Sequence, residues 1–174
     1  TDPEYGVAAG GDLNGDGLSD LVYSERVRSY SGPWVPGRSV FVVFGRAPGY
    51  PPALGPADLN GHNGFRYLAE PDADLAGADA AMAGDVNGDG IDDLAIYSER
   101  CCSAPALRDR DVVHVIFGRR GGFPAQWDES MLDGTRGFMI VTDPVNGGGR
   151  VAGGGDVNRD GIDDLLIALN HSEG

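Results

Sequence analysis

The sequence predicts an all-β protein assembled from tandem copies of one small antiparallel unit. A glycine- and aspartate-rich segment occurs three times, at intervals of 73 and 71 residues. Short stretches rich in valine, isoleucine and phenylalanine recur in step with it, and glycine- and proline-rich segments separate them. No segment shows the periodicity of an amphipathic helix. These three observations favour repeated sheets over helical or mixed folds.

The repeat extends well beyond the acidic segment. Residues 11–21 return as 84–94 and again as 155–165, and 40–46 match 113–119. Two full repeats and the opening of a third therefore cover almost the whole chain. Self-similarity at a fixed period is typical of repeat architectures.

Each repeat is expected to supply four strands. A stretch of small residues precedes the acidic segment and an apolar run follows it; a valine- and phenylalanine-rich strand and a strand beginning with phenylalanine come next. The expected strands cover 7–11, 21–23, 40–44 and 65–68 in the first repeat, 80–84, 94–97, 113–117 and 138–141 in the second, and 151–155 and 165–169 in the third. Four short antiparallel strands repeated in tandem are typical of β-propeller blades. We predict about two and a half blades, with boundaries at 5–77, 78–148 and 149–174.

The acidic segments have the pattern D-x-N-x-D-G-x-x-D, beginning at Asp12, Asp85 and Asp156. Positions 1, 3 and 5 place side-chain oxygens on one side of a tight turn, which the glycine at position 6 permits. A carbonyl at position 7 and the aspartate at position 9 complete a set of oxygen ligands. Such a set suits Ca²⁺, which takes six to eight oxygens, and the loops contain no Cys or His for softer metals. The pattern predicts three calcium sites.

Two alternatives are weaker. An EF-hand needs a glutamate at position 12 and flanking helices, but Tyr23, Ile96 and Ile167 occupy that position within predicted strands. Ordinary Asx-Gly turns with solvated carboxylates are the simpler alternative. However, three carboxylates crowd into each loop and would repel one another without a cation, and the pattern occurs three times in register.

These motifs resemble the FG-GAP repeat, the blade unit of the integrin α-subunit propeller and of many bacterial surface and secreted proteins. Phe44-Gly45 and Phe117-Gly118 match the "FG", and the acidic loops match the calcium loops of that family. The "GAP" half is absent, because Tyr23-Ser24-Glu25 and Tyr97-Ser98-Glu99 stand in its place.

The resemblance implies a propeller stabilised by Ca²⁺, usually seven-bladed, with an extracellular role in adhesion or ligand binding. Ser19 stands where the other loops have Asp92 and Asp163, at a position that is not a ligand, and we expect either residue to be tolerated there. By resemblance the metal ligands are Asp12, Asn14, Asp16, Leu18 (carbonyl) and Asp20; Asp85, Asn87, Asp89, Ile91 (carbonyl) and Asp93; and Asp156, Asn158, Asp160, Ile162 (carbonyl) and Asp164.

Charge and hydropathy exclude several other functions. The chain has 27 acidic residues against 13 basic ones, all of them arginine. It therefore has no Schiff-base or P-loop lysine, and its overall charge disfavours nucleic acid and anionic lipid as partners. No run approaches the ~18 apolar residues that span a membrane as a helix. The N-terminus lacks a basic-then-apolar leader, so we expect that a signal peptide was removed or that the chain is part of a longer protein.

We expect no catalysis. His62, His114 and His171 do not recur as a set, and the loops contain no motif for a nucleophile. His114 replaces Phe41 in a strand and is expected to be half-buried. Cys101 and Cys102 are adjacent, which leaves open a vicinal disulfide, a bond to another chain, or two free thiols.

The leading interpretation is an extracellular module, secreted or at the cell surface, that binds a protein or glycan ligand. Antiparallel blades place 24–38 and 98–111 opposite the calcium loops, and their arginine and aromatic residues are typical of contact surfaces. The alternative is a structural subunit that assembles with further copies of itself. A half-blade leaves an unpaired edge, so either the rest of a longer propeller covers it, or copies pair by their edge strands into a ring or filament.

Overall fold

The computed structural model describes residues 4–26, 39–68, 75–99, 110–144 and 149–169. These segments form eleven β-strands and two short 3-10 helices, arranged in three sheets. They contain no α-helix. None of their helices is long or apolar enough to cross a membrane. The predicted all-β class is confirmed.

The first sheet has the strand order β1-β2-β3-β4-β8. The first four strands follow one another along the chain, and each pairs antiparallel with the next. The fifth strand pairs parallel with β4. Their bounds are β1 Glu4–Ala9, β2 Leu21–Arg26, β3 Ser39–Val43, β4 Gly64–Leu68 and β8 Gln126–Trp127, with a 3-10 helix η1 at Pro56–Asp58.

The second sheet repeats this arrangement and the third contains its first half. The second has the order β5-β6-β7-β9 with antiparallel neighbours, and the third pairs β10 with β11. Their bounds are β5 Leu75–Gly84, β6 Asp93–Glu99, β7 Arg110–Ile116, β9 Gly137–Pro144, β10 Gly149–Gly155 and β11 Asp164–Leu169, with a 3-10 helix η2 at Glu129–Met131.

The ten expected strands are all present, with differences at their ends. β1 begins earlier than predicted and stops at Ala9, because Gly10 has a φ of 113° and starts the turn. β5 also begins earlier, at Leu75. Strand β8 and the two 3-10 helices were not predicted from the sequence.

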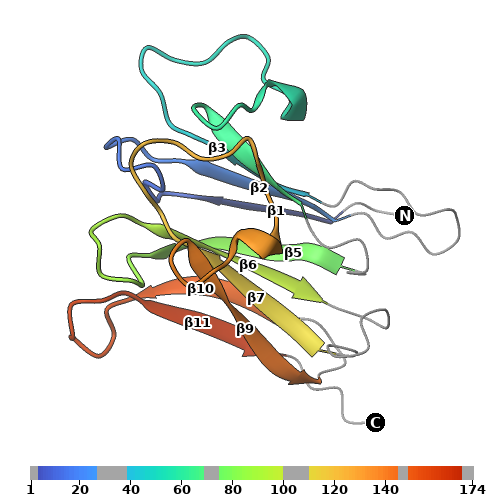
Figure 1. Cartoon of the computed structure of the whole chain (residues 1–174), viewed down its shortest axis with the longest axis vertical. Coiled ribbons are helices and arrows are strands. Elements are labelled where there is room, and N and C mark those ends of the chain that lie inside the picture. Colours follow the sequence, from blue (N-terminus) through green and yellow to red (C-terminus); the bar gives the residue numbers. More distant parts are fainter. Residues whose placement is uncertain (1–3, 27–38, 69–74, 100–109, 145–148, 170–174) are drawn as a thin grey trace, which may run out of the picture.

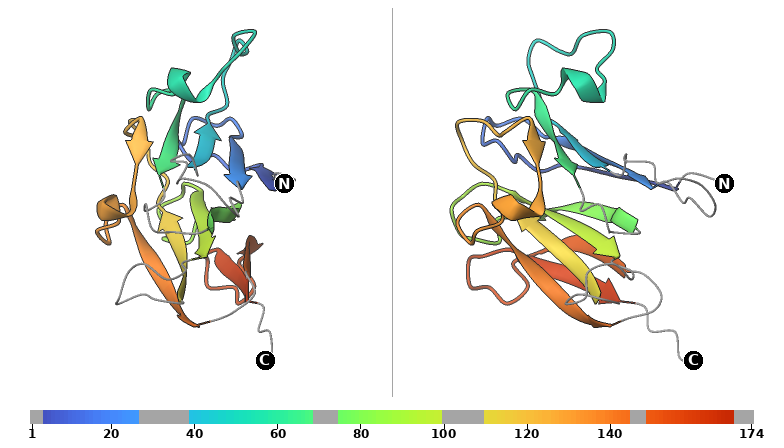
Figure 2. Two further views of the ribbon diagram at one scale, coloured as in Figure 1. Left: turned by 90° about the vertical axis from the view of Figure 1, so that its right-hand side faces the viewer. Right: turned by 45° about the vertical axis from the view of Figure 1, so that its right-hand side comes forward.

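The second sheet lies between the other two (Figures 1 and 2). Successive residues of a strand point to opposite faces, and both faces of β6 are buried. Leu94 and Ile96 belong to one hydrophobic cluster with Val22 and Phe65 of the first sheet. The other face of β6 and β7 contributes Ala95, Tyr97, Val113 and Val115 to a second cluster that includes Val151 of the third sheet. Strand β5 contacts β1, β2 and β10, so the first strands of the repeats lie next to one another.

A segment of the second repeat fills the space beside the first sheet. Trp127 in β8 is fully buried and packs in tilted geometry against Phe65 and Phe123, at ring-centroid distances of 6.2 and 5.9 Å. Phe44 lies 5.4 Å from Phe123 in the same cluster. This aromatic group and the β4–β8 pairing join the two repeats.

Candidate metal centre

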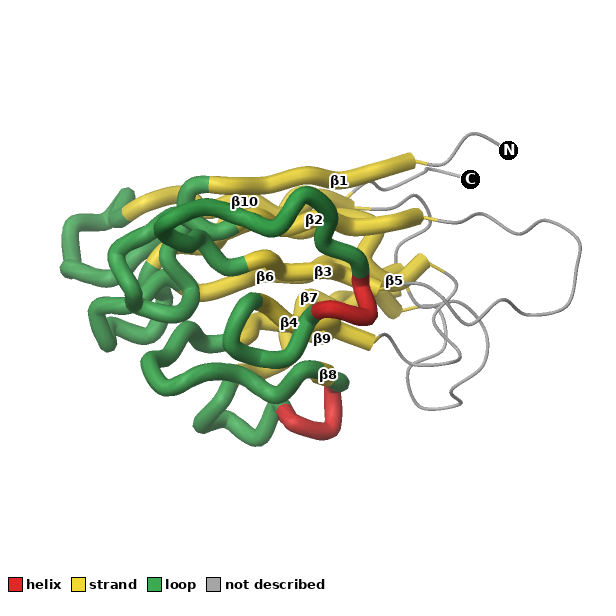
Figure 3. Tube along the Cα trace, turned by 90° about the horizontal axis from the view of Figure 1, so that it is seen from above, coloured by secondary structure: helices red, strands yellow, loops and turns green. Residues whose placement is uncertain are grey.

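The three acidic loops lie at the same end of the molecule. Each connects the first and second strands of its sheet: β1 to β2, β5 to β6, and β10 to β11. Figures 1 and 3 show these turns gathered at one end of the strands. The predicted ligands of each loop are therefore local to that loop, as the sequence pattern requires.

All three loops share one set of hydrogen bonds. The first aspartate accepts the N–H groups of positions 5 and 6, at 3.0 and 2.7 Å for Asp12, 3.0 and 2.7 Å for Asp85, and 3.0 and 2.8 Å for Asp156. The Oδ1 of the asparagine at position 3 accepts the N–H of position 5. The aspartate at position 5 accepts the N–H of position 7. These bonds wrap the backbone around the side-chain oxygens of positions 1, 3 and 5.

The turn requires left-handed backbone at positions 4 and 6. Gly15 and Gly17 have φ values of 68° and 86°, and the second loop has glycine at both positions as well. In the third loop Arg159 occupies position 4 with a φ of 65°, the only positive φ outside glycine among the described residues. A side chain in this conformation costs about 1 kcal/mol.

In the first and second loops, the aspartate at position 9 is buried. Asp20 and Asp93 are both fully buried. Asp20 accepts the N–H of Leu13 within its own loop at 2.8 Å, and the N–H of Gly45 after β3 at 2.8 Å. Asp93 accepts the N–H of Val86 at 3.0 Å and that of Gly118 at 2.8 Å. The "FG" glycines therefore hold the last predicted ligand of the loop, a link that the sequence did not reveal.

These glycines also need the absence of a side chain. A Cβ on Gly45 would lie 2.6 Å from the carbonyl oxygen of Ser19, and one on Gly118 would lie 2.1 Å from that of Asp92. Both distances are below any real Cβ contact. The close approach brings the backbone N–H within reach of the carboxylate.

Burial disfavours the charged form of the carboxyl groups of Asp20 and Asp93. Burial raises the pKa of Asp20 to about 6, with the charges of Asp12 and Asp16 adding to the effect and the two backbone N–H bonds opposing it. Burial likewise raises the pKa of Asp93 to about 7, and Asp89 and Asp85 add to it. A cation bound among these carboxylates would relieve both effects.

The third loop is less enclosed. Asp164 accepts the N–H of Val157 at 2.8 Å, as its counterparts do, but it is only half-buried. No "FG" segment follows β11 in the described part of the chain. The hydrogen bonds within the third loop therefore form without an "FG" segment.

The aspartates at position 8 connect neighbouring loops. Asp92 accepts the backbone N–H of Asp12 at 2.8 Å, and Asp163 accepts that of Asp85 at 3.0 Å. The sequence analysis expected this position to tolerate either serine or aspartate. The structure gives the two aspartates a specific contact, which the repeated Asp-Asp pair could have indicated.

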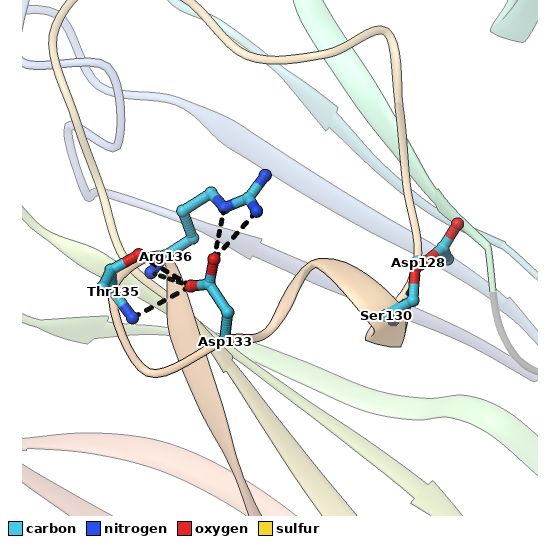
Figure 4. A network of polar contacts seen from close by, with 5 residues as sticks. All are labelled: Asp128, Ser130, Asp133, Thr135 and Arg136. Carbon is cyan, nitrogen blue, oxygen red and sulfur yellow. Dashed lines mark hydrogen bonds and ion pairs between the residues drawn. The ribbon is translucent and has the colours of Figure 1, made fainter.

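In the turn at 133–136, which is not one of the acidic loops, an arginine stabilises the carboxylate of an aspartate. Asp133 accepts the N–H groups of Thr135 and Arg136 and forms an ion pair of 2.8 Å with the Arg136 guanidinium (Figure 4). The hydrogen bond from Arg136 holds the pKa of Asp133 well below its usual range. Nearby, Asp128 caps η2 by accepting the N–H of Ser130. By contrast, no arginine of the described segments forms an ion pair with the acidic loops.

The residue types of the loops fit a calcium ion. Each loop supplies three carboxylates and an amide oxygen, which are ligands of the kind that Ca²⁺ prefers. Within the described residues, however, no three acidic, His or Cys side chains form a group close enough to hold a metal.

Other predicted features fall partly or wholly outside the described residues. Most of 24–38 and 98–111 lies there, as do Cys101, Cys102 and His171. His114 is fully buried rather than half-buried, because its ring lies 5.3 Å from that of Tyr67 across the contact between the first two sheets.

No protein-family model matches the chain, and no curated protein matches it significantly. The arguments for function therefore come from the loops and their surroundings.

Proposed function

We propose that this chain is a calcium-binding β-propeller module of the FG-GAP type, in which Ca²⁺ has a structural role. The observation that carries the proposal is the buried aspartate at position 9, held by backbone N–H groups from two segments and placed beside two further carboxylates. Burying a charge is costly unless a counter-charge accompanies it. A divalent cation in each loop supplies that charge, and the three loops share one geometry.

The arrangement of sheets supports the propeller. Two successive sheets stack face to face, and each contains four antiparallel strands of one repeat, to which β8 is added in the first sheet. The third sheet begins in the same way. Their first strands lie together, as expected for the inner strands of blades around an axis. Leu21 and Tyr23 are exposed on the face of the first sheet that points away from the second sheet. Their counterparts Leu94 and Ile96 are fully buried against that sheet, so a further blade would cover Leu21 and Tyr23 in the same way.

We propose that the module recognises a protein or glycan in the extracellular space rather than catalysing a reaction. A serine, a histidine and a carboxylate of the described residues lie in a line, but the serine and the histidine are buried. Ser98 Oγ lies 3.5 Å from His114 Nδ1, and Glu129 lies 3.4 Å from His114 Nε2. Ser98 and His114 are 1% and 3% exposed, so a substrate could not reach the hydroxyl group.

A second candidate function is self-assembly through edge strands, and β11 favours it. Its counterparts β2 and β6 each have two hydrogen-bonded neighbours, whereas β11 pairs only with β10 among the described strands. Leu166 on β11 is 54% exposed. Sedimentation of the calcium-loaded chain separates the candidates, because a stable monodisperse monomer would exclude assembly by edge pairing.

Calorimetric titration of demetallated protein with Ca²⁺ tests the calcium sites directly. We expect three bound ions per chain and a higher Tm, since binding to the folded form adds RT ln(1 + [Ca²⁺]/Kd) per site, about 2.7 kcal/mol at a hundredfold excess. Excess EGTA should reverse the gain. An absence of binding heat together with an unchanged melting curve would overturn the proposal.

A further inference from the structure

The aspartate at position 8 of the second and third loops forms a hydrogen bond with the preceding loop rather than with its own. Asp92 lies between two predicted ligands of the second loop, the Ile91 carbonyl and the Asp93 carboxylate. Its own carboxylate instead accepts the backbone N–H of Asp12, 80 residues away, at 2.8 Å. Asp163 makes the same contact with Asp85 at 3.0 Å.

Main-chain hydrogen bonds reinforce these contacts. The N–H of Asp163 donates to the carbonyl of Asp85 at 3.0 Å, so these two residues are bonded in both directions. The N–H of Arg119, directly after Gly118, donates to the carbonyl of Leu13 at 2.9 Å. The fit is close, because a Cβ on Gly84 would lie 2.2 Å from Asp163 Oδ2. The first and second loops are thus each positioned by the repeat that follows them.

We propose that Asp92 and Asp163 couple neighbouring calcium sites, so that binding in one loop raises the affinity of the loop before it. This inference rests on the proposed calcium function. An ion in the second loop would fix positions 7 and 9, which flank Asp92, and thereby its carboxylate. That carboxylate holds the backbone of Asp12, which is the first ligand of the first loop. Less of the first loop then has to be ordered when it binds its own ion. By linkage, the effect is reciprocal.

The first loop provides a matched control. Ser19 occupies position 8 there and is exposed. Asp92→Ser places the residue of the first loop at the coupling position of the second without touching a predicted ligand. Ser19→Ala alters position 8 where the described chain has no preceding loop, and it should leave all affinities unchanged.

The test is a Ca²⁺ titration monitored by the NMR signals of the backbone amides of Gly17, Gly90 and Gly161. Each amide reports on one loop, because it donates to the first aspartate of that loop. Asp89→Ala removes a predicted ligand of the second loop. It should weaken calcium binding in the first loop, read at the Gly17 amide, about fivefold, at the low end of measured couplings. Asp92→Ser should weaken it similarly, and adding Asp89→Ala should then have no further effect.

The outcomes separate the two proposals. If no glycine amide responds to Ca²⁺, the proposed function itself fails. If all three respond but neither Asp89→Ala nor Asp92→Ser changes the midpoint at Gly17, the sites are independent and the coupling is refuted. Should Asp92→Ser fold poorly, Asp163→Ser read at Gly90 tests the same coupling between the second and third loops.

Discussion

The backbone N–H of Gly45 donates a 2.8 Å hydrogen bond to the buried carboxylate of Asp20, 25 residues earlier in the chain. The second repeat reproduces this contact between Gly118 and Asp93 at 2.8 Å. The glycine after the third strand of a sheet thus fixes the residue that begins or precedes the second strand. The acidic loop and the "FG" motif form one structural unit.

Replacing the "FG" glycines by alanine should destabilise the protein. For Gly118→Ala, whose Cβ would meet a backbone oxygen at 2.1 Å, we expect a loss of about 2–3 kcal/mol, and for Gly45→Ala somewhat less. Urea unfolding followed by circular dichroism measures both. Gly55→Ala is the control, since its nearest contact is an ordinary 3.5 Å. Equal stability of all three variants would show that the close approach has no energetic weight.

Without calcium, acidification should stabilise the fold. The pKa values of Asp93 and Asp20 are raised to about 7 and about 6. A raised pKa means that the folded state binds the proton more tightly than the unfolded chain. The contribution of this proton binding to the free energy of unfolding is complete below the pKa of the unfolded chain, ~3.9. It is lost as the pH rises through 6 to 7.

Melting curves of demetallated protein between pH 8 and pH 5.5 measure this effect. We expect Tm to rise by a few degrees on acidification, and the rise to shrink in Asp93→Asn. In saturating Ca²⁺ the rise should disappear, because the ion then neutralises the carboxylates and protons compete with it. The same pH profile in the wild type and Asp93→Asn would argue against a raised pKa of Asp93.

Arg159→Gly should stabilise the third loop. Arg159 has a φ of 65° at the position where the first and second loops have Gly15 and Gly88. Removing the Cβ relieves about 1 kcal/mol of backbone strain, of which the greater freedom of glycine in the unfolded chain offsets part. We expect a rise in Tm of about 1–3 °C. Arg159→Ala retains the Cβ and should give no gain, so equal melting temperatures for the two variants would contradict the strain argument.

Trp127→Ala should be among the most damaging single changes. Its indole is fully buried between the repeats, and truncating such a side chain costs about 3–5 kcal/mol. The neighbouring exposed Gln126 provides the control, for which alanine should change the unfolding free energy by less than about 0.5 kcal/mol. In the described structure the indole N–H has no hydrogen-bond partner, so Trp127→Phe should retain most of the stability. Denaturant unfolding of the three variants would reveal a peripheral role for β8 if Trp127→Ala resembled Gln126→Ala.

Much of the fold follows from local sequence. The apolar run at 94–97 and the valine-, isoleucine- and phenylalanine-rich segment at 113–117 predict β6 and β7. The spacing of Asp12, Asn14 and Asp16 predicts a tight turn with converging oxygens. These features depend on residues close together in the chain, so the pattern carries them. The EF-hand alternative was excluded in the same way, and Tyr23, Ile96 and Ile167 do lie in strands.

What only the tertiary structure decided involves residues far apart in the chain. The bond from Gly45 to Asp20 and the contact of Asp92 with Asp12 depend on how strands and repeats pack. Strand β8 is too short to show a periodicity and pairs with β4, a strand of the other repeat. The sequence by itself determined the repeat, ten of the eleven described strands and the residue types of the loops, because short-range patterns dictate them. The packing of one sheet on the next decided which carboxylates are buried and which loops touch, because burial depends on neighbours that local patterns do not specify.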